Sequence, residues 1–210
     1  QTNSNKDSFA MFFVKDGYLA NFLAILPLLN NQQINEIDSN RNSLIMNAIK
    51  KKNDEFALNA LFINKNINLE IVNKNNETVY SLCADYGNSI KMEALINNDD
   101  NLTPEKIRLA LPLILKKGDI SKYWNNFIEI DPSIINYKDQ DNNNLFMICA
   151  SQANFKNIDF IFSENIHYSL RDMNNQKQTL MDILISLPEE HENDVIRTLD
   201  YFKKNSKNKP

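Results

Sequence analysis

The order of polar and apolar residues in this chain repeats. Three segments open at Asp38, Asn73 and Asp139 with a short polar run, continue with apolar residues, and reach Ala or Cys ten positions later. A fourth opens at Asn174 and carries Leu184 at that tenth place. The openings are separated by 35, 66 and 35 residues, and the middle spacing is two periods of about 33. The chain is therefore predicted to repeat one short unit, with a degenerate copy in the middle.

Elementary physical chemistry assigns a local structure to this unit. The polar opening favours a turn, since Asp and Asn bond to their own backbone. A Ser, Thr or Asn five residues later is suited to cap a helix by accepting a backbone N–H bond. The apolar run that follows predicts a first helix, and its small residue allows close helix packing. We expect these helix caps at Ser43, Thr78, Asn144 and Thr179.

A second apolar run follows each first helix after a short break. These runs predict second helices over residues 56–63, 90–96 and 158–162. In the second clear copy the break is Tyr86-Gly87-Asn88, where Gly87 is suited to a helix C-cap. Each unit is thus predicted to be a pair of helices joined by tight turns. Helical spacing also places most aromatic residues in the core: Phe56, Phe62, Phe146, Phe160 and Phe162.

With four copies in one register, the chain resembles the ankyrin-repeat family. That family reads roughly Asp-x-x-Gly-x-Thr-Pro-Leu-His-x-Ala-Ala-x-x-Gly, followed by a second helix and a hairpin. This chain departs from the pattern, because Thr-Pro-Leu-His is absent from every copy. The usual turn glycine is replaced by Arg41, Asn76, Asn142 and Lys177. The resemblance implies an all-α solenoid of stacked helix pairs with protruding turns.

Continuing the period along the chain gives about six repeats. They cover residues 8–37, 38–72, 73–101, 102–138, 139–173 and 174–204 of a single 1–210 solenoid. The first repeat has Gly17 at its break, and Pro27 is expected to bend its second helix. A charged helix over residues 189–204 is expected to cap the last repeat, because terminal repeats need a polar outer face.

The fourth repeat lacks the usual opening and is expected to be irregular. Thr103 and Pro104 form a helix start, with Thr as cap and Pro at the first helical position. Pro112 lies inside this helix and should kink or divide it. Gly118 marks the break, and a second helix is expected over residues 123–128, where Trp124 should pack internally.

Composition excludes several classes of protein. Apolar residues make up 42% and charged residues 24% of the chain, with a net charge of −4, so we expect a folded protein and no nucleic-acid partner. The longest apolar stretch, Phe22–Leu29, is too short to span a membrane. The chain begins with Gln1, and the compartment stays open between the cytoplasm and a secreted or periplasmic location.

Catalytic and metal-binding patterns are weak. Cys83 and Cys149 share one repeat position two repeats apart, too far to pair, and are read as small buried residues rather than nucleophiles. His167 falls in a repeat-end turn. His191 lies in an acidic run, which is read as a solvated helix start rather than a weak metal site. We therefore expect no enzyme, no cofactor and no metal site.

The resemblance implies that a partner protein docks on the concave face made by the turn tips and first helices. Tyr86 is either an aromatic binding anchor or an ordinary surface residue. Carried over position by position, the expected partner-binding residues are Lys50, Lys51, Lys74, Asn75, Glu77, Asp85, Tyr86, Gln140, Asp141, Asn143, Ser151, Gln152 and Gln178. The irregular repeat is expected to divide this face into two parts.

Three functions fit such a monomeric binding module. It could engage another protein directly, for example as a bacterial effector acting on a host protein. It could be a periplasmic or extracytoplasmic accessory protein that protects or scaffolds an enzyme. It could also be the targeting domain of a larger enzyme. The sequence does not identify the partner, because one fold can serve many unrelated functions.

Overall fold

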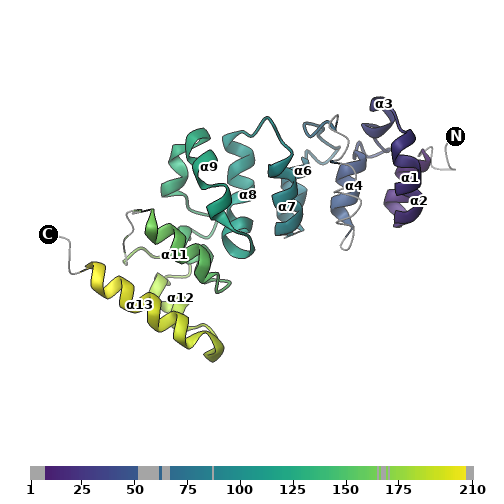
Figure 1. Cartoon of the computed structure of the whole chain (residues 1–210). Coiled ribbons are helices and arrows are strands. Elements are labelled where there is room, and N and C mark those ends of the chain that lie inside the picture. Colours follow the sequence, from purple (N-terminus) through teal and green to yellow (C-terminus); the bar gives the residue numbers. More distant parts are fainter. Residues whose placement is uncertain are drawn as a thin grey trace. The chain divides into compact units, whose positions relative to one another are not determined.

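The computed structural model describes residues 8–51, 62, 67–86, 88–164, 166, 169 and 171–206. It divides into two compact units, Gln1–Leu102 and Thr103–Pro210, and each is described by itself (Figure 1). Within the described ranges the regular structure is helical, with two isolated bridges joining Ile37 to Ser43 and Lys138 to Asn144. The all-α prediction is confirmed.

In the first unit, first helices stack on first helices. The elements are α1 (Phe9–Asp16), α2 (Leu19–Ile25), η1 (Leu26–Leu28), α3 (Asn31–Ile34), α4 (Leu44–Lys50), α6 (Val79–Asp85) and α7 (Ser89–Asn97). Helix α4 packs on both α1 and α6, while α2 packs on α1 and α7 packs on α6. This order is the expected stack of helix pairs.

The second unit repeats the arrangement. Its elements are α8 (Pro104–Lys117), η2 (Ile120–Lys122), α9 (Trp124–Ile130), η3 (Pro132–Asn136), α10 (Leu145–Ala150), α11 (Phe155–Ser163), α12 (Leu180–Ile185), η4 (Glu189–His191) and α13 (Glu192–Ser206). Helix α10 packs on α8 and α12, and the second helices α9, α11 and α13 each pack on the first helix before them. Trp124 is buried, as expected.

Every predicted N-cap on a first helix is confirmed. The side chains of Ser43, Thr78, Asn144 and Thr179 each accept the backbone N–H three residues later. Thr103 does the same for α8, with Pro104 at the first helical position. These bonds satisfy backbone donors that a helix start otherwise leaves free.

The four residues that replace the turn glycine all adopt left-handed backbone. Their φ angles are 64° for Arg41, 60° for Asn76, 63° for Asn142 and 62° for Lys177. Side chains with a Cβ rarely occupy this region, where glycine is the usual choice. The turn geometry has therefore been kept although its glycine is absent.

Pro112 does not divide its helix, so that part of the prediction is wrong. Helix α8 runs unbroken from Pro104 to Lys117. Pro112 removes only the bond to the Arg108 carbonyl, and the Tyr137 hydroxyl lies 3.5 Å from that oxygen. The two turns around Pro112 also bury Ile107, Ala110, Leu111, Leu113, Ile114 and Leu115, and this apolar burial outweighs the lost bond.

Pro27, which was expected to bend the second helix of the first repeat, lies just beyond the end of that helix. Helix α2 ends at Ile25, and Pro27 lies in the tighter turn η1 that follows. Gly17 ends α1 in left-handed backbone, with φ of 79°. Apart from residue 62, the predicted helix over residues 56–63 lies outside the described residues, as do the Gly87 cap and His167.

Candidate protein-binding surface

Each repeat opening builds the same turn. The Oδ1 atom of Asp38 accepts the backbone N–H groups of Asn40 and Asn42 at 2.9 and 2.8 Å. The Asp38 N–H donates to the Asn42 carbonyl at 2.9 Å, and the Arg41 N–H donates to the Asp38 carbonyl at 2.9 Å. The turns that open at Asn73, Asp139 and Asn174 contain the same four bonds. One polar side chain thus closes each tip from inside.

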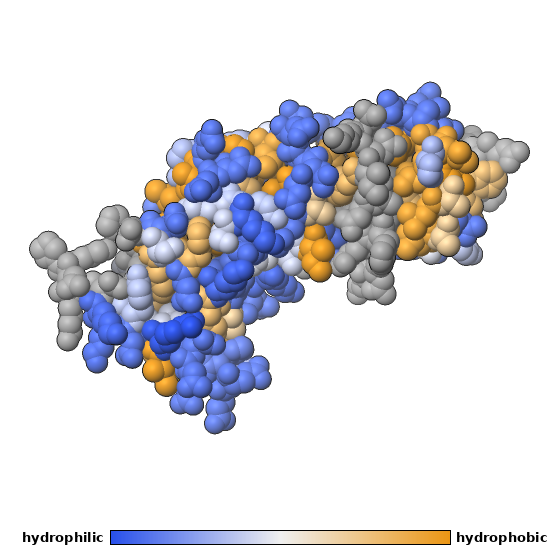
Figure 2. Space-filling view, viewed as in Figure 1, coloured by the Kyte–Doolittle hydropathy of each residue, from blue (hydrophilic) through white to orange (hydrophobic). Residues whose placement is uncertain are grey.

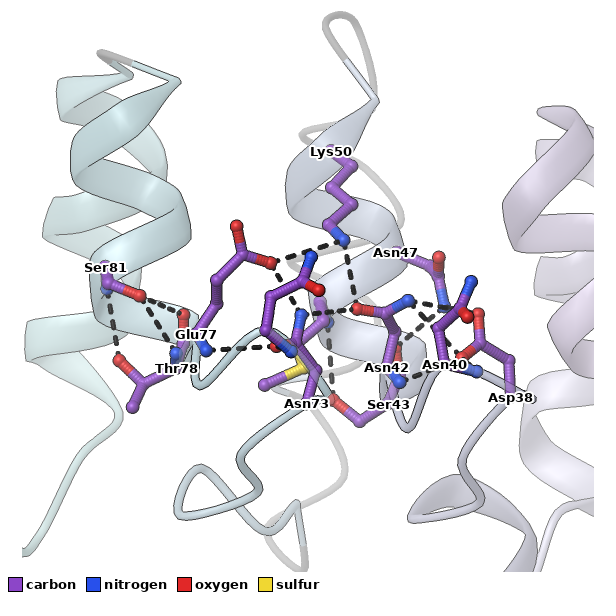
Figure 3. Close-up of polar contacts among 12 residues, drawn as sticks. Asp38, Asn40, Asn42, Ser43, Asn47, Lys50, Asn73, Glu77, Thr78 and Ser81 are labelled. Atoms are coloured by element: carbon purple, nitrogen blue, oxygen red, sulfur yellow. Dashed lines mark hydrogen bonds and ion pairs between the residues drawn. The ribbon is translucent and has the colours of Figure 1, made fainter.

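Neighbouring tips are also bonded to one another. In the first unit, the Lys74 N–H donates to the Asn40 carbonyl at 3.0 Å, and Asn73 Nδ2 donates to Asn42 Oδ1 at 2.9 Å (Figure 3). In the second unit the corresponding bonds, at matching repeat positions, measure 2.8 and 2.9 Å. They join Asn175 to Asp141 and Asn174 to Asn143. In each unit these bonds hold adjacent tips in a fixed register.

In the first unit, a pair of oppositely charged side chains joins the hydrogen bonds between the tips. Lys50, at the end of α4, directs its Nζ toward the tips, 3.0 Å from Asn42 Oδ1 and 3.8 Å from Glu77 Oε2. Glu77 also accepts a bond from Asn73 Nδ2 at 2.6 Å. The four side chains form a connected network in Figure 3. Two predicted site residues, Lys50 and Glu77, are therefore brought together from adjacent repeats.

The second unit uses neutral groups in the same places. Gln178 stands where Glu77 stands, and its Oε1 accepts from Asn174 Nδ2 at 3.2 Å. The Gln140 carbonyl accepts from Asn175 Nδ2 at 3.1 Å. Ser151 stands where Lys50 stands and donates to the Ile148 carbonyl of its own helix at 2.8 Å. The two units thus present tips of the same geometry and different charge.

Most of the predicted binding residues reach the surface. Tyr86 is 47% exposed and follows directly on the end of α6. Lys50, Lys51, Glu77 and Asn143 are half-buried. The exposed members are Lys74, Asn75, Asp85, Tyr86, Gln140, Asp141, Ser151, Gln152 and Gln178. Residues 50–86 of this set lie in the first unit and residues 140–178 in the second.

The carboxylate beneath the first tip is buried. Burial by itself raises the pKa of Asp38, but hydrogen bonds from Asn42, Asn40 and Asn47 outweigh it and hold the pKa below its ordinary value of 3.8. Lys15 Nζ lies 3.6 Å from Asp38 Oδ2. Asp38 is therefore a structural anion that orders the tip, and its neighbours Ser39, Asn40 and Arg41 are the exposed members of that turn.

Sequence reasoning missed two buried polar residues that join the repeats. Lys91 of α7 donates from Nζ to the carbonyls of Ala48 and Ile49, each at 3.1 Å, and to the carbonyl of Lys51. Asn157 of α11 donates from Nδ2 to the carbonyls of Ile114 and Leu115, each at 3.0 Å. Each side chain thus caps the end of the preceding repeat's first helix.

Lys91 and Asn157 stand at the same repeat position, eighteen residues after their openings Asn73 and Asp139. The sequence did contain a signal for this contact: a polar residue recurs at one repeat position inside a predicted second helix. Its meaning depends on contacts between residues about forty positions apart, which periodicity does not reveal.

The two cysteines are unsuited to nucleophilic chemistry. Both are free and buried. Burial raises the pKa of the Cys83 thiol to about 12 and raises the pKa of Cys149 as well, so the reactive thiolate is scarce at neutral pH. In the part of the chain that the structure describes, no group of three His, Cys, Asp or Glu residues could hold a metal ion. Among the same residues, no helix is long and apolar enough to cross a membrane.

Comparisons with known proteins bear on the fold. No protein-family model and no curated protein matches the sequence. A chain in the solved complex of the predatory endopeptidase Bd0816 from Bdellovibrio bacteriovorus with the immunity protein Bd3460 is similar in structure. Its TM-score is 0.58 at 18% identity, over 96% of this chain and 99% of that one.

Two ankyrin repeat domains are also among the structural matches. That of human ASB11 has a TM-score of 0.41 at 15% identity, over 91% of this chain and 97% of that one. That of Bcl-3 has a TM-score of 0.43 at 12% identity, over 92% and 100%. The stacked helix pairs, capped first helices and left-handed turns described above give this chain an ankyrin-like, all-α repeat fold.

Proposed function

We propose that this chain is a protein-binding module whose partner docks on the turn tips and the adjoining ends of the first helices. The observation that carries the proposal is the pair of bonded tips within each unit, in which the buried side chains at the openings fix the backbone and leave neighbouring side chains exposed. A surface ordered in advance loses little conformational freedom on binding.

The composition of this surface favours a protein partner. Its exposed groups are mostly amides, hydroxyls and isolated charges, typical of a wet interface held by hydrogen bonds. Tyr86 supplies a large exposed ring between Asp85 and the second helix α7. Tyrosine is enriched among residues that dominate binding energy, so we propose Tyr86 as the anchor of the first unit's surface.

Variants in the first unit test this proposal. Binding proteins would be isolated from the source cell, and one identified partner titrated against the chain by calorimetry. We expect Tyr86→Ala and Lys74→Glu each to weaken binding at least tenfold, about 1.4 kcal/mol. Lys204→Glu is the matched control, because Lys204 is an exposed lysine on α13. Full retention of binding by both Tyr86→Ala and Lys74→Glu would contradict the proposal.

A second candidate is an accessory protein that binds and restrains an enzyme. The observation that favours it is the similar chain found in a complex of an endopeptidase with an immunity protein, where nearly the whole of both chains aligns. This candidate predicts that the partner isolated above has an enzymatic activity that falls when the chain is added. An enzyme whose rate is unchanged by saturating chain would contradict it. The effector and targeting roles remain predictions.

A further inference from the structure

The second helix of the first repeat is apolar over nearly all of its surface. Helix α2 contains a single polar residue, Asn21. Phe22 is buried against the stack, yet the opposite stripe is also apolar and exposed: Ala20, Leu23, Ala24 and Pro27. An ordinary surface helix carries polar residues on that stripe, and a helix that is apolar all round is normally covered.

Helix α1 repeats this feature with aromatic residues. Ala10, Met11 and Val14 are its buried side, and α1 packs on α4. The opposite side carries Phe9, which is 46% exposed. The half-buried rings of Phe12 and Phe13 lie on that side too and pack around Tyr18, which is 51% exposed. Their centroids lie 5.6 and 6.3 Å from that of Tyr18.

These side chains form a large apolar patch on the first helix pair, which we call the α1–α2 patch. Figure 2 shows apolar side chains gathered over α1 and α2. Leu28 is 80% exposed and Leu23 is 38% exposed. With roughly 200 Å² for a large side chain, the exposed parts of Phe9, Tyr18, Leu23 and Leu28 amount to about 400 Å². The neighbouring rings, alanines and proline raise the patch to about 600 Å², the upper end for a monomer.

The charge of the patch indicates what covers it. Residues 8–29 contain only Lys15 and Asp16 as charged groups, and Lys15 lies 3.6 Å from Asp38. A two-fold contact brings each residue close to its own copy or to a neighbour of it, so a charged face repels itself and a nearly neutral one does not. An apolar face without net charge therefore suits a second copy of this chain.

We propose that the α1–α2 patch is the contact surface of a symmetric homodimer. Two such patches bury about 1,200 Å² in total, at the low end for specific interfaces, so the dimer forms in a concentration-dependent way. This differs from the monomer that the sequence suggested. The patch shares no residue with the proposed binding surface, and the dimer does not depend on the proposed function.

Sedimentation equilibrium of the full chain tests the dimer directly. From about 1 to 300 µM we expect the mass to rise from 24.4 kDa toward twice that value. Leu23→Glu should raise the dimer dissociation constant at least tenfold, because two copies would place carboxylates in an apolar contact. Ile196→Glu is the matched control, since Ile196 is 50% exposed on α13, and it should leave the constant unchanged.

Two results would overturn the dimer. One is a monomer mass throughout the concentration range, which would leave the patch to another occupant. The other is an equal effect of Leu23→Glu and Ile196→Glu, which would show association through general hydrophobicity. Circular dichroism checks that each variant is folded. If Leu23→Glu unfolds, Leu28→Glu decides the question, because Leu28, at 80%, is the most exposed of the large hydrophobic residues in the patch.

Discussion

At the scale of single residues, the repeat openings perform one task with two kinds of side chain. Asp38 and Asp139 are carboxylates, whereas Asn73 and Asn174 are amides, and all four present Oδ1 to two backbone N–H groups. The amide of an Asn opening does not ionise, whereas the carboxylate of Asp38 does. Asp38 is buried with a lowered pKa, so the first unit should sense acid where an amide opening would not.

The pH dependence of Asp38→Asn measures that difference. Because the folded-state pKa of Asp38 lies below 3.8, its ionised form adds stability that is present above the unfolded pKa and is lost as pH falls through the folded pKa. We expect urea unfolding between about pH 5 and 2 to show a shallower loss of stability for Asp38→Asn than for the parent. The control Ser39→Ala changes an exposed residue of the same turn that does not ionise, and it should keep the parent slope; equal slopes for all three chains would contradict the prediction.

Backbone strain at the tips gives a second prediction. Lys177 has φ of 62°, a conformation that costs a residue with a Cβ about 1 kcal/mol or more. Lys177→Gly should therefore stabilise the chain by roughly 0.5 kcal/mol, after the entropy that glycine adds to the unfolded state. Gln176→Gly, one residue before it in ordinary backbone, should destabilise by a similar amount. Thermal unfolding of both variants checks the sign, and a loss of stability at both positions would refute it.

At the scale of elements, the sequence was sufficient wherever one short segment determines the structure. Local bonding and spacing predicted the turns that open at Asp38 and Asn73 and the caps at Ser43 and Thr78. The prediction that Pro112 would divide α8 was wrong, because its effect depends on burial against other helices and on the Tyr137 hydroxyl. A rule based on the local sequence takes neither into account. Local chemistry thus predicts where helices begin, and tertiary packing decides whether they continue.

The buried polar residues at position eighteen of the repeat give the element-scale prediction. Lys91→Met keeps the length of the side chain but removes the donor from three carbonyls at the end of α4. Groups left unsatisfied in this way cost about 1–3 kcal/mol, and Asn157→Leu should cost a similar amount at α8.

Urea unfolding at neutral pH measures both losses. Lys74→Met is the control for Lys91→Met, because Lys74 is exposed at a tip and should change stability by less than about 0.5 kcal/mol. If the Lys91 and Lys74 variants unfold at the same urea concentration, the proposed capping of α4 is wrong.

At the scale of the whole molecule, the sequence anticipated which residues reach the surface better than how they are joined. Tyr86, Asp85 and Lys74 are exposed as expected. The bonds from Lys50 to Asn42 and Glu77 were not anticipated, since they link repeats through side chains whose directions depend on the stack. The apolar α1–α2 patch was missed for a related reason. A run of apolar residues in the sequence predicts a buried helix, and only the structure shows that one side of that helix is exposed.

The binding face itself is tested most directly by labelling lysines in a complex. A partner purified with the chain would be held at saturation, and acetylation of each lysine compared with that of the free chain by mass spectrometry. We expect Lys50, Lys51 and Lys74 to become protected, while Lys204, exposed on the second helix α13, reacts as before. Protection confined to Lys204, with Lys74 and Lys51 reacting as in the free chain, would contradict the proposed binding surface.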